Sequence, residues 1–520
     1  MPIRLTNGPL AARLLHGSKY QSPAARNSTT IIYPREQRTM TLKGFSSFVI
    51  AASIVPLWPA ASLAAETAQP TIGGELPLAS MVPFVALLFS IAVLPLAAPH
   101  WWEHNRNKLI VSAVLGAPLA VYLVATYGDE GLVPLEHAAV EYLSFIALLG
   151  SLFVISGGIY VKGSLSGTPL LNTALLAIGS ILANVVGTTG ASVLLIRPLL
   201  RANTPRQRKA HVVIFFIFVV SNCGGLLTPL GDPPLFLGFL KGVPFDWTLR
   251  LFPQWLVVNG LLLAIFNIWD QTIFNKEERE RPGSQLEQVQ QHEPLRIVGL
   301  HNLVFLAAIV GIVYASGQGI GNGGEPWPPL VQAAAMVLAA LVSYALTAPS
   351  IRQNNHFVFA PIVEVAVLFA GIFVTMLPAL AILNAWGQGD REVFGITFAM
   401  TEPAQYFWAT GALSSFLDNA PTYLTFAATA SGLEKVSTEG RYLADFLASG
   451  PRAHELLAAI SSGAVFMGAN TYIGNGPNFM VKAIAEHGGV RMPGFFGYMA
   501  YSIGILIPIF IAVTLLFFAA

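Results

Sequence analysis

The fold is decided by the stretch Ser221-Asn222-Cys223-Gly224-Gly225-Leu226-Leu227-Thr228-Pro229-Leu230-Gly231-Asp232-Pro233-Pro234, which interrupts an apolar run over residues 210–240. Proline cannot donate a backbone hydrogen bond, and the residue before a proline avoids the α region. A matching interruption lies inside the apolar run 455–486 and reads Gly468-Ala469-Asn470-Thr471-Tyr472-Ile473-Gly474-Asn475-Gly476-Pro477-Asn478. Each stretch predicts a membrane helix that unwinds near its middle and exposes carbonyl groups and half-helix ends.

The composition is that of a membrane protein. The chain has 520 residues, of which 54% are hydrophobic and 11% charged, whereas soluble domains carry about 25% charged residues. The net charge of +1 gives no basic field for nucleic acid. A single cysteine, Cys223, excludes an intramolecular disulfide and a multi-cysteine metal site. The sequence has no GxxxxGK[ST] motif for ATP hydrolysis. We therefore expect a transporter, not an enzyme, that needs no cofactor.

Ten segments are apolar and long enough to cross a bilayer, which takes about 20 residues. Their expected spans are 78–98, 108–127, 137–161, 210–240, 247–272, 297–316, 327–346, 358–383, 455–486 and 494–518. Short loops on the cytoplasmic side carry an excess of Lys and Arg. Loops 99–107, 202–209 and 347–357 contain Lys or Arg, whereas loops 128–136 and 317–326 contain neither. The basic loops all lie on the cytoplasmic side if the first span, 78–98, begins on the external side of the membrane.

Two further apolar segments, 170–201 and 403–431, are expected to be re-entrant hairpins. If 170–201 crossed once, the basic loop 202–209 would be external, against the positive-inside bias. The expected tips are Asn184-Val185-Val186-Gly187-Thr188-Thr189-Gly190 and Leu417-Asp418-Asn419-Ala420-Pro421-Thr422. Irregular backbone at membrane depth is tolerated where it lines a cavity or is buried in protein. The alternative is that both segments are ordinary kinked single helices.

The order helix, hairpin, broken helix, final helix occurs twice. The helices before the hairpins begin similarly, with Glu141-Tyr142-Leu143-Ser144-Phe145 and Glu364-Val365-Ala366-Val367-Leu368-Phe369. By the count of crossings, the two copies face opposite sides of the membrane. Inverted repeats with broken helices are the architecture of secondary transporters, with the binding site at the repeat interface. We expect an all-α polytopic membrane protein with a first half at 78–272, a cytoplasmic connector at 273–296 and a second half at 297–520.

The N-terminal region has the pattern of a secretory signal. Residues 1–39 carry six Arg or Lys and one acid, Glu36. Met40 is followed by an apolar run from Phe45 to Leu63 that ends in the small-x-small triplet Ser62-Leu63-Ala64. We expect residues 1–65 to be an extension plus a signal peptide that starts at Met40. The alternatives are an uncleaved first membrane helix and an organellar transit peptide.

The hairpin tips and broken helices hold oxygen-bearing side chains that suit a hard cation such as Na⁺. The candidate ion- or substrate-binding residues are Asn184, Thr188, Thr189, Asn222, Thr228, Asp232, Asp418, Asn419, Thr422, Asn470, Thr471, Asn475 and Asn478. An ionisable group inside the membrane costs roughly 2.5–3.5 kcal/mol and marks a functional site by default. The candidate proton carriers are therefore Asp232, Asp418, Glu141 and Glu364.

Each candidate also has a structural explanation. Asn222 and Asn470 could satisfy broken backbone, and Asp232 and Asp418 could cap half-helices. Glu141 and Glu364 stand near helix beginnings, where a carboxylate complements the helix dipole. These alternatives remain open at the level of sequence.

The hairpin sequence Ser414-Ser415-Phe416-Leu417-Asp418-Asn419 resembles the signature of the ion transporter superfamily. That superfamily includes arsenite efflux pumps, NhaD-type Na⁺/H⁺ antiporters and citrate or dicarboxylate carriers. Over 78–520 the chain looks most like bacterial proteins named as citrate transporters or sodium:proton antiporters. The residues that carry this likeness are 364–376, 228–234 and 475–478. The resemblance implies a multi-pass secondary transporter of the bacterial inner membrane, often a homodimer, with a scaffold and a transport domain.

Two substrates are compatible with these residues. Carboxylates at both motif regions, Asp232 and Asp418, favour exchange of Na⁺ or Li⁺ for H⁺. The alternative is Na⁺- or H⁺-coupled uptake of citrate or a dicarboxylate. Dicarboxylate carriers of the superfamily have paired Ser-Asn-Thr motifs at the hairpin tips, whereas here the second tip begins with an acid, Asp418, which would repel a carboxylate. Antiport is therefore the first hypothesis, with the bilayer, a small inorganic cation and a proton as the partners.

Overall fold

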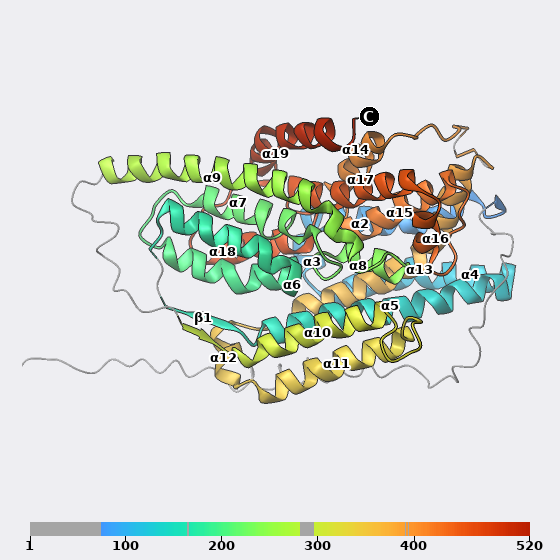
Figure 1. Cartoon of the computed structure of the whole chain (residues 1–520), viewed down its shortest axis with the longest axis horizontal. Coiled ribbons are helices and arrows are strands. Elements are labelled where there is room, and N and C mark those ends of the chain that lie inside the picture. Colours follow the sequence, from blue (N-terminus) through green and yellow to red (C-terminus); the bar gives the residue numbers. More distant parts are fainter. Residues whose placement is uncertain (1–73, 164–165, 281–295, 391, 394, 520) are drawn as a thin grey trace, which may run out of the picture.

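The computed structural model describes residues 74–519 apart from 164–165, 281–295, 391 and 394. The described chain is almost entirely helical (Figure 1). Its first half contains η2 (Leu78–Met81), α2 (Val82–Ala97), α3 (Pro99–Trp102), α4 (Asn105–Tyr127), α5 (Asp129–Ser156), α6 (Pro169–Ala202), α7 (Ala210–Val219), η3 (Cys223–Leu226), α8 (Pro233–Leu240), η4 (Trp247–Leu251) and α9 (Phe252–Glu280).

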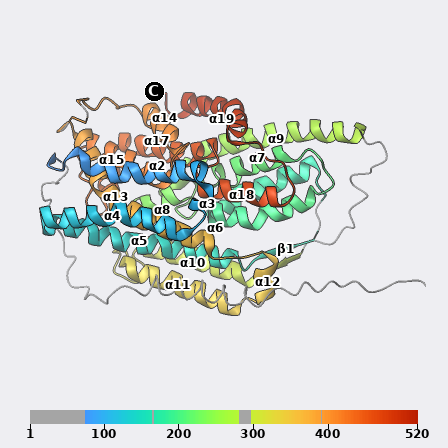
Figure 2. The ribbon, with the colours of Figure 1, turned by 180° about the vertical axis from the view of Figure 1, so that it is seen from behind.

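The second half begins after the connector. It contains α10 (His301–Gly317), α11 (Pro329–Leu346), α12 (Pro349–Asn354), α13 (Ala360–Gln388), α14 (Pro403–Ser414), α15 (Asn419–Leu433), α16 (Tyr442–Ala448), α17 (Pro451–Met467), η5 (Gly468–Asn470), α18 (Gly476–His487) and α19 (Phe495–Phe517). The strands of the described residues are β1 (Tyr160–Lys162) and β2 (Arg296–Val298), which pair antiparallel and join the two halves. Figure 2 shows α2 and α4, in blue, on the side that lies farther away in Figure 1.

Eight helices of the described chain are long and apolar enough to cross a membrane. They include spans expected from the sequence, such as Asn105–Tyr127 and Phe495–Phe517, and also Pro169–Ala202, which was expected to be a hairpin. Many of their side chains, for example Val114, Val121 and Leu338, are apolar and exposed. Lipid is the solvent that such surfaces need. The chain is thus a polytopic α-helical membrane protein.

α6 is a hairpin and not one straight helix. Gly187 has φ 77° and ψ 155° inside the segment, a conformation that glycine adopts without a steric penalty. Asn172 near the beginning and Asn203 just past the end exchange side-chain hydrogen bonds of 3.0 and 2.8 Å. A straight helix would separate two such residues by about 45 Å. The chain therefore reverses at Gly187, as the sequence predicts.

α14 and α15 form the second hairpin, with the turn at residues 415–418. Thr401, before α14, accepts a hydrogen bond of 3.1 Å from Arg452. Glu434, after α15, lies 3.9 Å from the same arginine. The two ends of this segment therefore meet at one place. The interpretation of either segment as a single kinked helix is wrong.

The two hairpins open at opposite ends of the helical bundle. α9 shows this, because its C-terminal half carries Asp270, which is bonded to Asn172 at the base of the first hairpin. Just before α9, Trp247 donates a hydrogen bond of 2.7 Å to His454, close to the base of the second hairpin. Trp247 and Asp270 are separated by about 35 Å of helix, slightly more than the hydrocarbon thickness of a bilayer. The inverted symmetry of the two halves stays a prediction. It requires the two hairpins to open at opposite ends, as they do.

Some expected boundaries are wrong. Residues 128–136 were expected to form a loop, but α5 begins at Asp129, because Gly128 at φ 59° makes a tight turn between α4 and α5. Acidic Asp129 and Glu130 in the first turn favour a helix start. The connector expected at 273–296 begins as a continuation of α9 to Glu280. The expected extension and signal peptide at 1–65 lie outside the described residues.

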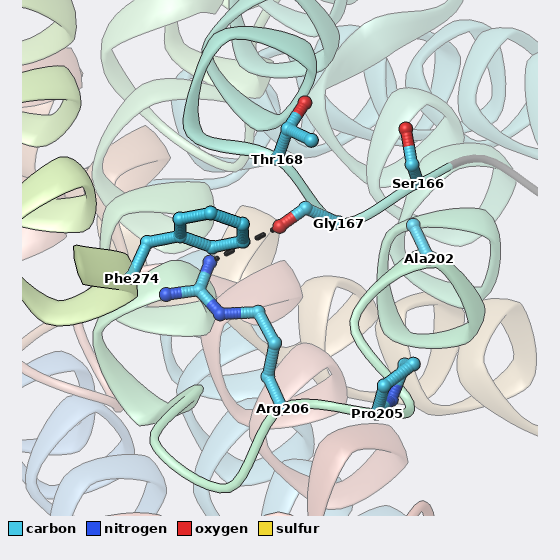
Figure 3. Close-up of a pocket in the computed structure, with 7 residues that line it drawn as sticks. All are labelled: Ser166, Gly167, Thr168, Ala202, Pro205, Arg206 and Phe274. Atoms are coloured by element: carbon cyan, nitrogen blue, oxygen red, sulfur yellow. Dashed lines mark hydrogen bonds between the residues drawn. The ribbon is translucent and has the colours of Figure 1, made fainter. Parts of the chain in front are cut away.

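Buried charges hold the base of the first hairpin. Asp270 is 0% exposed and bonds to His211, Arg206 and Asn172 at 2.8, 2.6 and 2.9 Å. Arg206 also donates to the Gly167 carbonyl beside a small pocket (Figure 3). A buried ion pair resists removal of either partner. This end of the hairpin is therefore fixed to α7 and α9.

The opposite placement of the hairpins predicts opposite labelling of two cysteines. In a Cys223→Ala background, Gln207→Cys should react with an impermeant maleimide only from the cytoplasmic side, and Ala448→Cys only from the external side. Both positions are exposed, in the basic loop 203–209 and at the end of α16. Labelling of intact cells and of everted vesicles measures this. Reaction of both cysteines from one side would contradict the arrangement.

Candidate functional site

Six buried polar side chains meet where the two hairpin tips and the two breaks converge. They form one hydrogen-bonded network, which we call the polar cluster: Thr188, Asn222, Asp232, Asn419, Asn475 and Asn478. Each is at most 4% exposed. The first hairpin supplies Thr188, the second supplies Asn419, and the two broken helices supply the rest. All six were candidates from the sequence.

Asp232 is the centre of the polar cluster. Its Oδ1 accepts a hydrogen bond of 2.8 Å from the Thr188 hydroxyl and one of 3.2 Å from the Asn475 amide. Its Oδ2 accepts a hydrogen bond from the Asn419 amide. All three donors are neutral. The carboxylate is thus removed from water and held by dipoles alone, without a cationic partner among the described hydrogen bonds and ion pairs.

The two breaks are joined directly to each other. The Asn222 amide donates to Asn478 Oδ1 at 2.7 Å, and the Asn475 amide donates to Asn222 Oδ1 at 3.2 Å. Asn475 also donates to the Ser221 carbonyl at 3.2 Å. Residues about 250 positions apart in the chain therefore form one rigid junction beside Asp232.

Unwinding leaves backbone carbonyls without helical partners, and side chains replace those partners. At the first break, Trp255 and Asn259 of α9 donate to the carbonyls of Gly224 and Cys223 at 2.9 and 3.1 Å. At the second, Asn478 donates to the Gly468 and Thr471 carbonyls at 2.8 and 2.9 Å. Tyr498 and Ser502 of α19 bond to the next two carbonyls, those of residues 469 and 470. Each break is therefore supported by the helix that follows it.

The breaks share a sequence pattern that sequence reasoning missed. Residues 225–234 and 468–477 both read Gly-x-x-Thr-x-x-Gly-(Asp/Asn)-x-Pro. The close approach of the glycines explains it: a Cβ on Gly231 would lie 2.2 Å from the Gly225 carbonyl oxygen, and one on Gly474 would lie 2.6 Å from that of Gly468. Asp232 and Asn475 occupy the same place, as extended N-cap residues of α8 and α18.

Other candidates support the polar cluster from outside. Asn184 accepts from the Leu227 amide at 2.7 Å through its side chain and from the Thr228 hydroxyl at 2.5 Å through its carbonyl. Thr471 and Asn470 bond to the backbone and the hydroxyl of Ser415. Ser415 stands in the quoted hairpin signature and was not chosen from the sequence.

Asp418 caps α15, and Asp232 does not cap α8. Asp418 Oδ1 accepts a hydrogen bond of 3.1 Å from the Ala420 amide, and the Thr422 hydroxyl bonds to the Asp418 carbonyl at 2.9 Å. Asp232 occupies the N-cap position of α8, but its side chain makes no hydrogen bond to that helix. Of the two acids, Asp232 is therefore the one that contacts the polar cluster.

Glu141 and Glu364 lie in ion pairs elsewhere. Glu141 bonds to Lys241 at 2.7 Å, and Glu364 bonds to Lys108 at 2.7 Å. Neither glutamate is bonded to the polar cluster. Thr189 is half-buried and has no described bond to the cluster. The described residues contain no group of three or more His, Cys, Asp or Glu that could hold a metal ion.

The polar cluster has an unused acceptor. Asn419 is 0% exposed, and no hydrogen-bond partner for its Oδ1 is found within the described chain. Buried polar atoms without partners are rare in native proteins. The same amide that donates to Asp232 thus carries an oxygen available to a ligand. Oxygen is the ligand atom that hard cations take.

A family model described as "Putative citrate transport" matches residues 73–518, which include both hairpins and the whole polar cluster. The chain belongs to this family. It is accordingly a multi-pass membrane transporter. A search of curated proteins found no match. The narrower grouping with arsenite pumps and NhaD-type antiporters stays a prediction.

The close backbone approach predicts that Gly231→Ala disturbs the site. The added Cβ would meet the Gly225 carbonyl oxygen at 2.2 Å, and overpacking of this kind costs about 1–3 kcal/mol. We expect a lower melting temperature in detergent. Gly476→Ala is the matched control, since it stands one residue after the N-cap Asn475 and a Cβ there meets nothing within 4 Å. Equal melting temperatures for the two variants would contradict the account.

Proposed function

We propose that this chain is a secondary antiporter of the bacterial inner membrane that exchanges Na⁺ or Li⁺ for H⁺. The observation that carries the proposal is the environment of Asp232. Its carboxylate is 1% exposed and bonded to three neutral donors, Thr188, Asn419 and Asn475. A buried carboxylate without a cationic partner is costly unless a proton or a bound cation neutralises it. Exchange of Na⁺ for H⁺ requires one site that binds either the proton or the cation, but not both at once.

The polar cluster suits a cation better than an anion. Among the described side chains that bond to it, none is Lys or Arg. The nearest acids, Asp232 and Asp418, repel a carboxylate substrate. Oxygen atoms from Asp232, Thr188 and the unused Asn419 Oδ1 could surround Na⁺ after the Asn419 amide turns. The carboxylate releases its proton when Na⁺ takes its place.

The surrounding elements give this exchange a route to both sides. Hairpins that open at opposite ends bring Thr188 and Asn419 to the same carboxylate. Movement of the hairpins and broken helices relative to α5 and α13 would expose Asp232 to one side at a time, the alternating access of secondary transporters. A state open to the cytoplasm would take up H⁺ or Na⁺ according to their concentrations there.

The second candidate is a citrate or dicarboxylate carrier. The description of the family favours it. The N-termini of α8, α15 and α18 also point toward the polar cluster, and helix N-termini attract anions. Two of these three N-termini, however, already carry an aspartate at the N-cap, Asp232 and Asp418. The negative charge of these aspartates reduces the positive potential that the helix N-termini would offer a carboxylate substrate.

Proteoliposomes that contain a pH-sensitive dye separate the two functions. The protein is reconstituted and the interior of the liposomes is made acidic relative to the outside. External NaCl or LiCl should then dissipate the pH gradient, whereas KCl and choline citrate should not. Uptake of radiolabelled citrate driven by a Na⁺ or H⁺ gradient, without cation-dependent proton efflux, would establish the carrier instead.

The central role of Asp232 predicts different results for two aspartate variants. Asp232→Asn keeps the shape but cannot titrate, so Na⁺-driven proton movement should fall to that of empty liposomes. Asp418→Asn should keep the fold, because asparagine caps a helix about as well as aspartate, and it should retain exchange at a reduced rate. Rates are normalised to folded protein by gel filtration. Normal exchange by a well-folded Asp232→Asn protein would remove this residue from the mechanism.

A further inference from the structure

A row of hydroxyl groups follows one arm of the second hairpin to Asp418. In α14, Tyr406, Thr410 and Ser414 succeed one another every four residues, and the turn that follows α14 leads to Asp418 at the beginning of α15. Residues four apart lie on the same face of a helix, with Cβ atoms about 5–6 Å from each other. The row covers about 12 Å of helix from Tyr406 to Ser414. That length is somewhat less than half the hydrocarbon thickness of a bilayer.

Two of the three hydroxyls of this row, those of Tyr406 and Thr410, lack protein partners within the described chain. Tyr406 and Thr410 are both 0% exposed, and within the described chain neither Tyr406 Oη nor Thr410 Oγ1 has a hydrogen-bond partner. Ser462, in the neighbouring α17, is in the same condition. Ser414 donates to the Ala464 carbonyl at 2.7 Å, which leaves its oxygen free to accept. Several unpaired buried hydroxyls in one place require an explanation, and water is the usual partner.

The first hairpin provides a contrast. Its corresponding arm carries Asn172, Leu176, Ser180 and Asn184 at the same spacing, so an apolar residue interrupts the row. Its polar groups are bonded within the protein: Asn172 to Asp270, Ser180 to the Ala177 carbonyl and Asn184 to the Gly224 carbonyl. Unpaired hydroxyls in an uninterrupted row therefore distinguish the second hairpin from the first.

The outer end of the row reaches a charged, wet surface. Arg452 donates a hydrogen bond to the carbonyl of Thr401, just before α14, and lies 3.9 Å from Glu434; the two side chains are 53% and 24% exposed. This is the end where the second hairpin opens, which the loop charges predict to be external. The inner end is Asp418, next in sequence to Asn419, which donates to Asp232. The row thus leads from the expected external surface to the tip of the second hairpin, beside the polar cluster.

We propose that Tyr406, Thr410 and Ser414, bridged by water, form the path along which protons pass between the external side and Asp418. This proposal rests on the proton coupling in the proposed function and names the residues that supply it. The hydroxyls do not bond to one another, so water completes the chain. At each step a hydroxyl oxygen accepts a proton from one neighbour and releases its own to the next. A hydronium ion outside loses one proton, and the carboxylate of Asp418 gains one.

Hydroxyl-radical footprinting of the full-length protein in detergent tests the presence of the water without reference to activity. Radicals formed from bound water should oxidise Tyr406 although the residue is buried. Tyr498 is the control, since it is also 0% exposed and its hydroxyl is bonded to the Ala469 carbonyl at 2.8 Å. Oxidation of Tyr406 but not of Tyr498 supports the path. Equal protection of both residues overturns it, whatever ion the protein transports.

Thr410→Val tests the path in transport, because valine keeps the shape of threonine and removes the hydroxyl. With reconstituted protein, Na⁺-driven proton movement should slow by at least about tenfold, as expected when a positioned proton-transfer group is lost. Thr410→Ser should restore the rate. Thr429→Val is the matched control, since Thr429 is buried on the other arm and bonds to its own helix at the Thr425 carbonyl, 2.8 Å away.

The readouts separate this path from the proposed function. Na⁺ binding is measured as the rise in melting temperature on adding NaCl. Thr410→Val should show the same rise as the wild type. If the wild type exchanges Na⁺ for H⁺ and Thr410→Val does so at the same rate, the path is overturned and the proposed antiport function still stands. Absence of Na⁺-dependent proton movement in the wild type overturns the proposed function, while footprinting still decides whether the row holds water.

Discussion

The structure depends on the burial of one carboxylate among neutral hydrogen-bond donors. Asp232 is held by Thr188 of one hairpin, Asn419 of the other and Asn475 of the second broken helix. A charge in this position could not persist in lipid, because the hydrocarbon offers no polar partner. The four elements must therefore converge for the site to exist. Each of them, in turn, exposes polar backbone that is satisfied only inside the assembled protein.

The backbone breaks follow from the same constraint. Helices that unwind at membrane depth leave carbonyl groups that must find donors. Trp255 and Asn259 supply them at one break, and Tyr498 and Ser502 at the other. The supporting residues come from α9 and α19, the helices that follow each broken helix. The close approach of Gly225 to Gly231, and of Gly468 to Gly474, leaves no room for a Cβ on Gly231 or Gly474. The supported breaks therefore hold Asp232, Asn222, Asn475 and Asn478 of the polar cluster in place.

Much of this arrangement could be predicted from the sequence. Proline and glycine inside apolar runs located both breaks, and the basic loop 202–209 indicated that α6 returns to the side it entered from. The roles of the two acids could not be predicted. Asp232 and Asp418 both stand before a half-helix, and only the folded chain shows that Asp418 caps its helix whereas Asp232 faces three donors. Glu141 and Glu364 looked similar to them, but their lysine partners lie 100 or more residues away in the chain.

The central claim is that one buried carboxylate takes either a proton or Na⁺, and the most direct test measures both at once. Purified protein in weakly buffered solution is titrated with NaCl while a pH electrode records released protons and calorimetry records bound Na⁺. The account predicts release of about one proton for each Na⁺ bound, since a ligand must lose its proton to bind a cation. It also predicts no release from Asp232→Asn. Sodium binding without proton release, or equal release from Asp232→Asn, would contradict it.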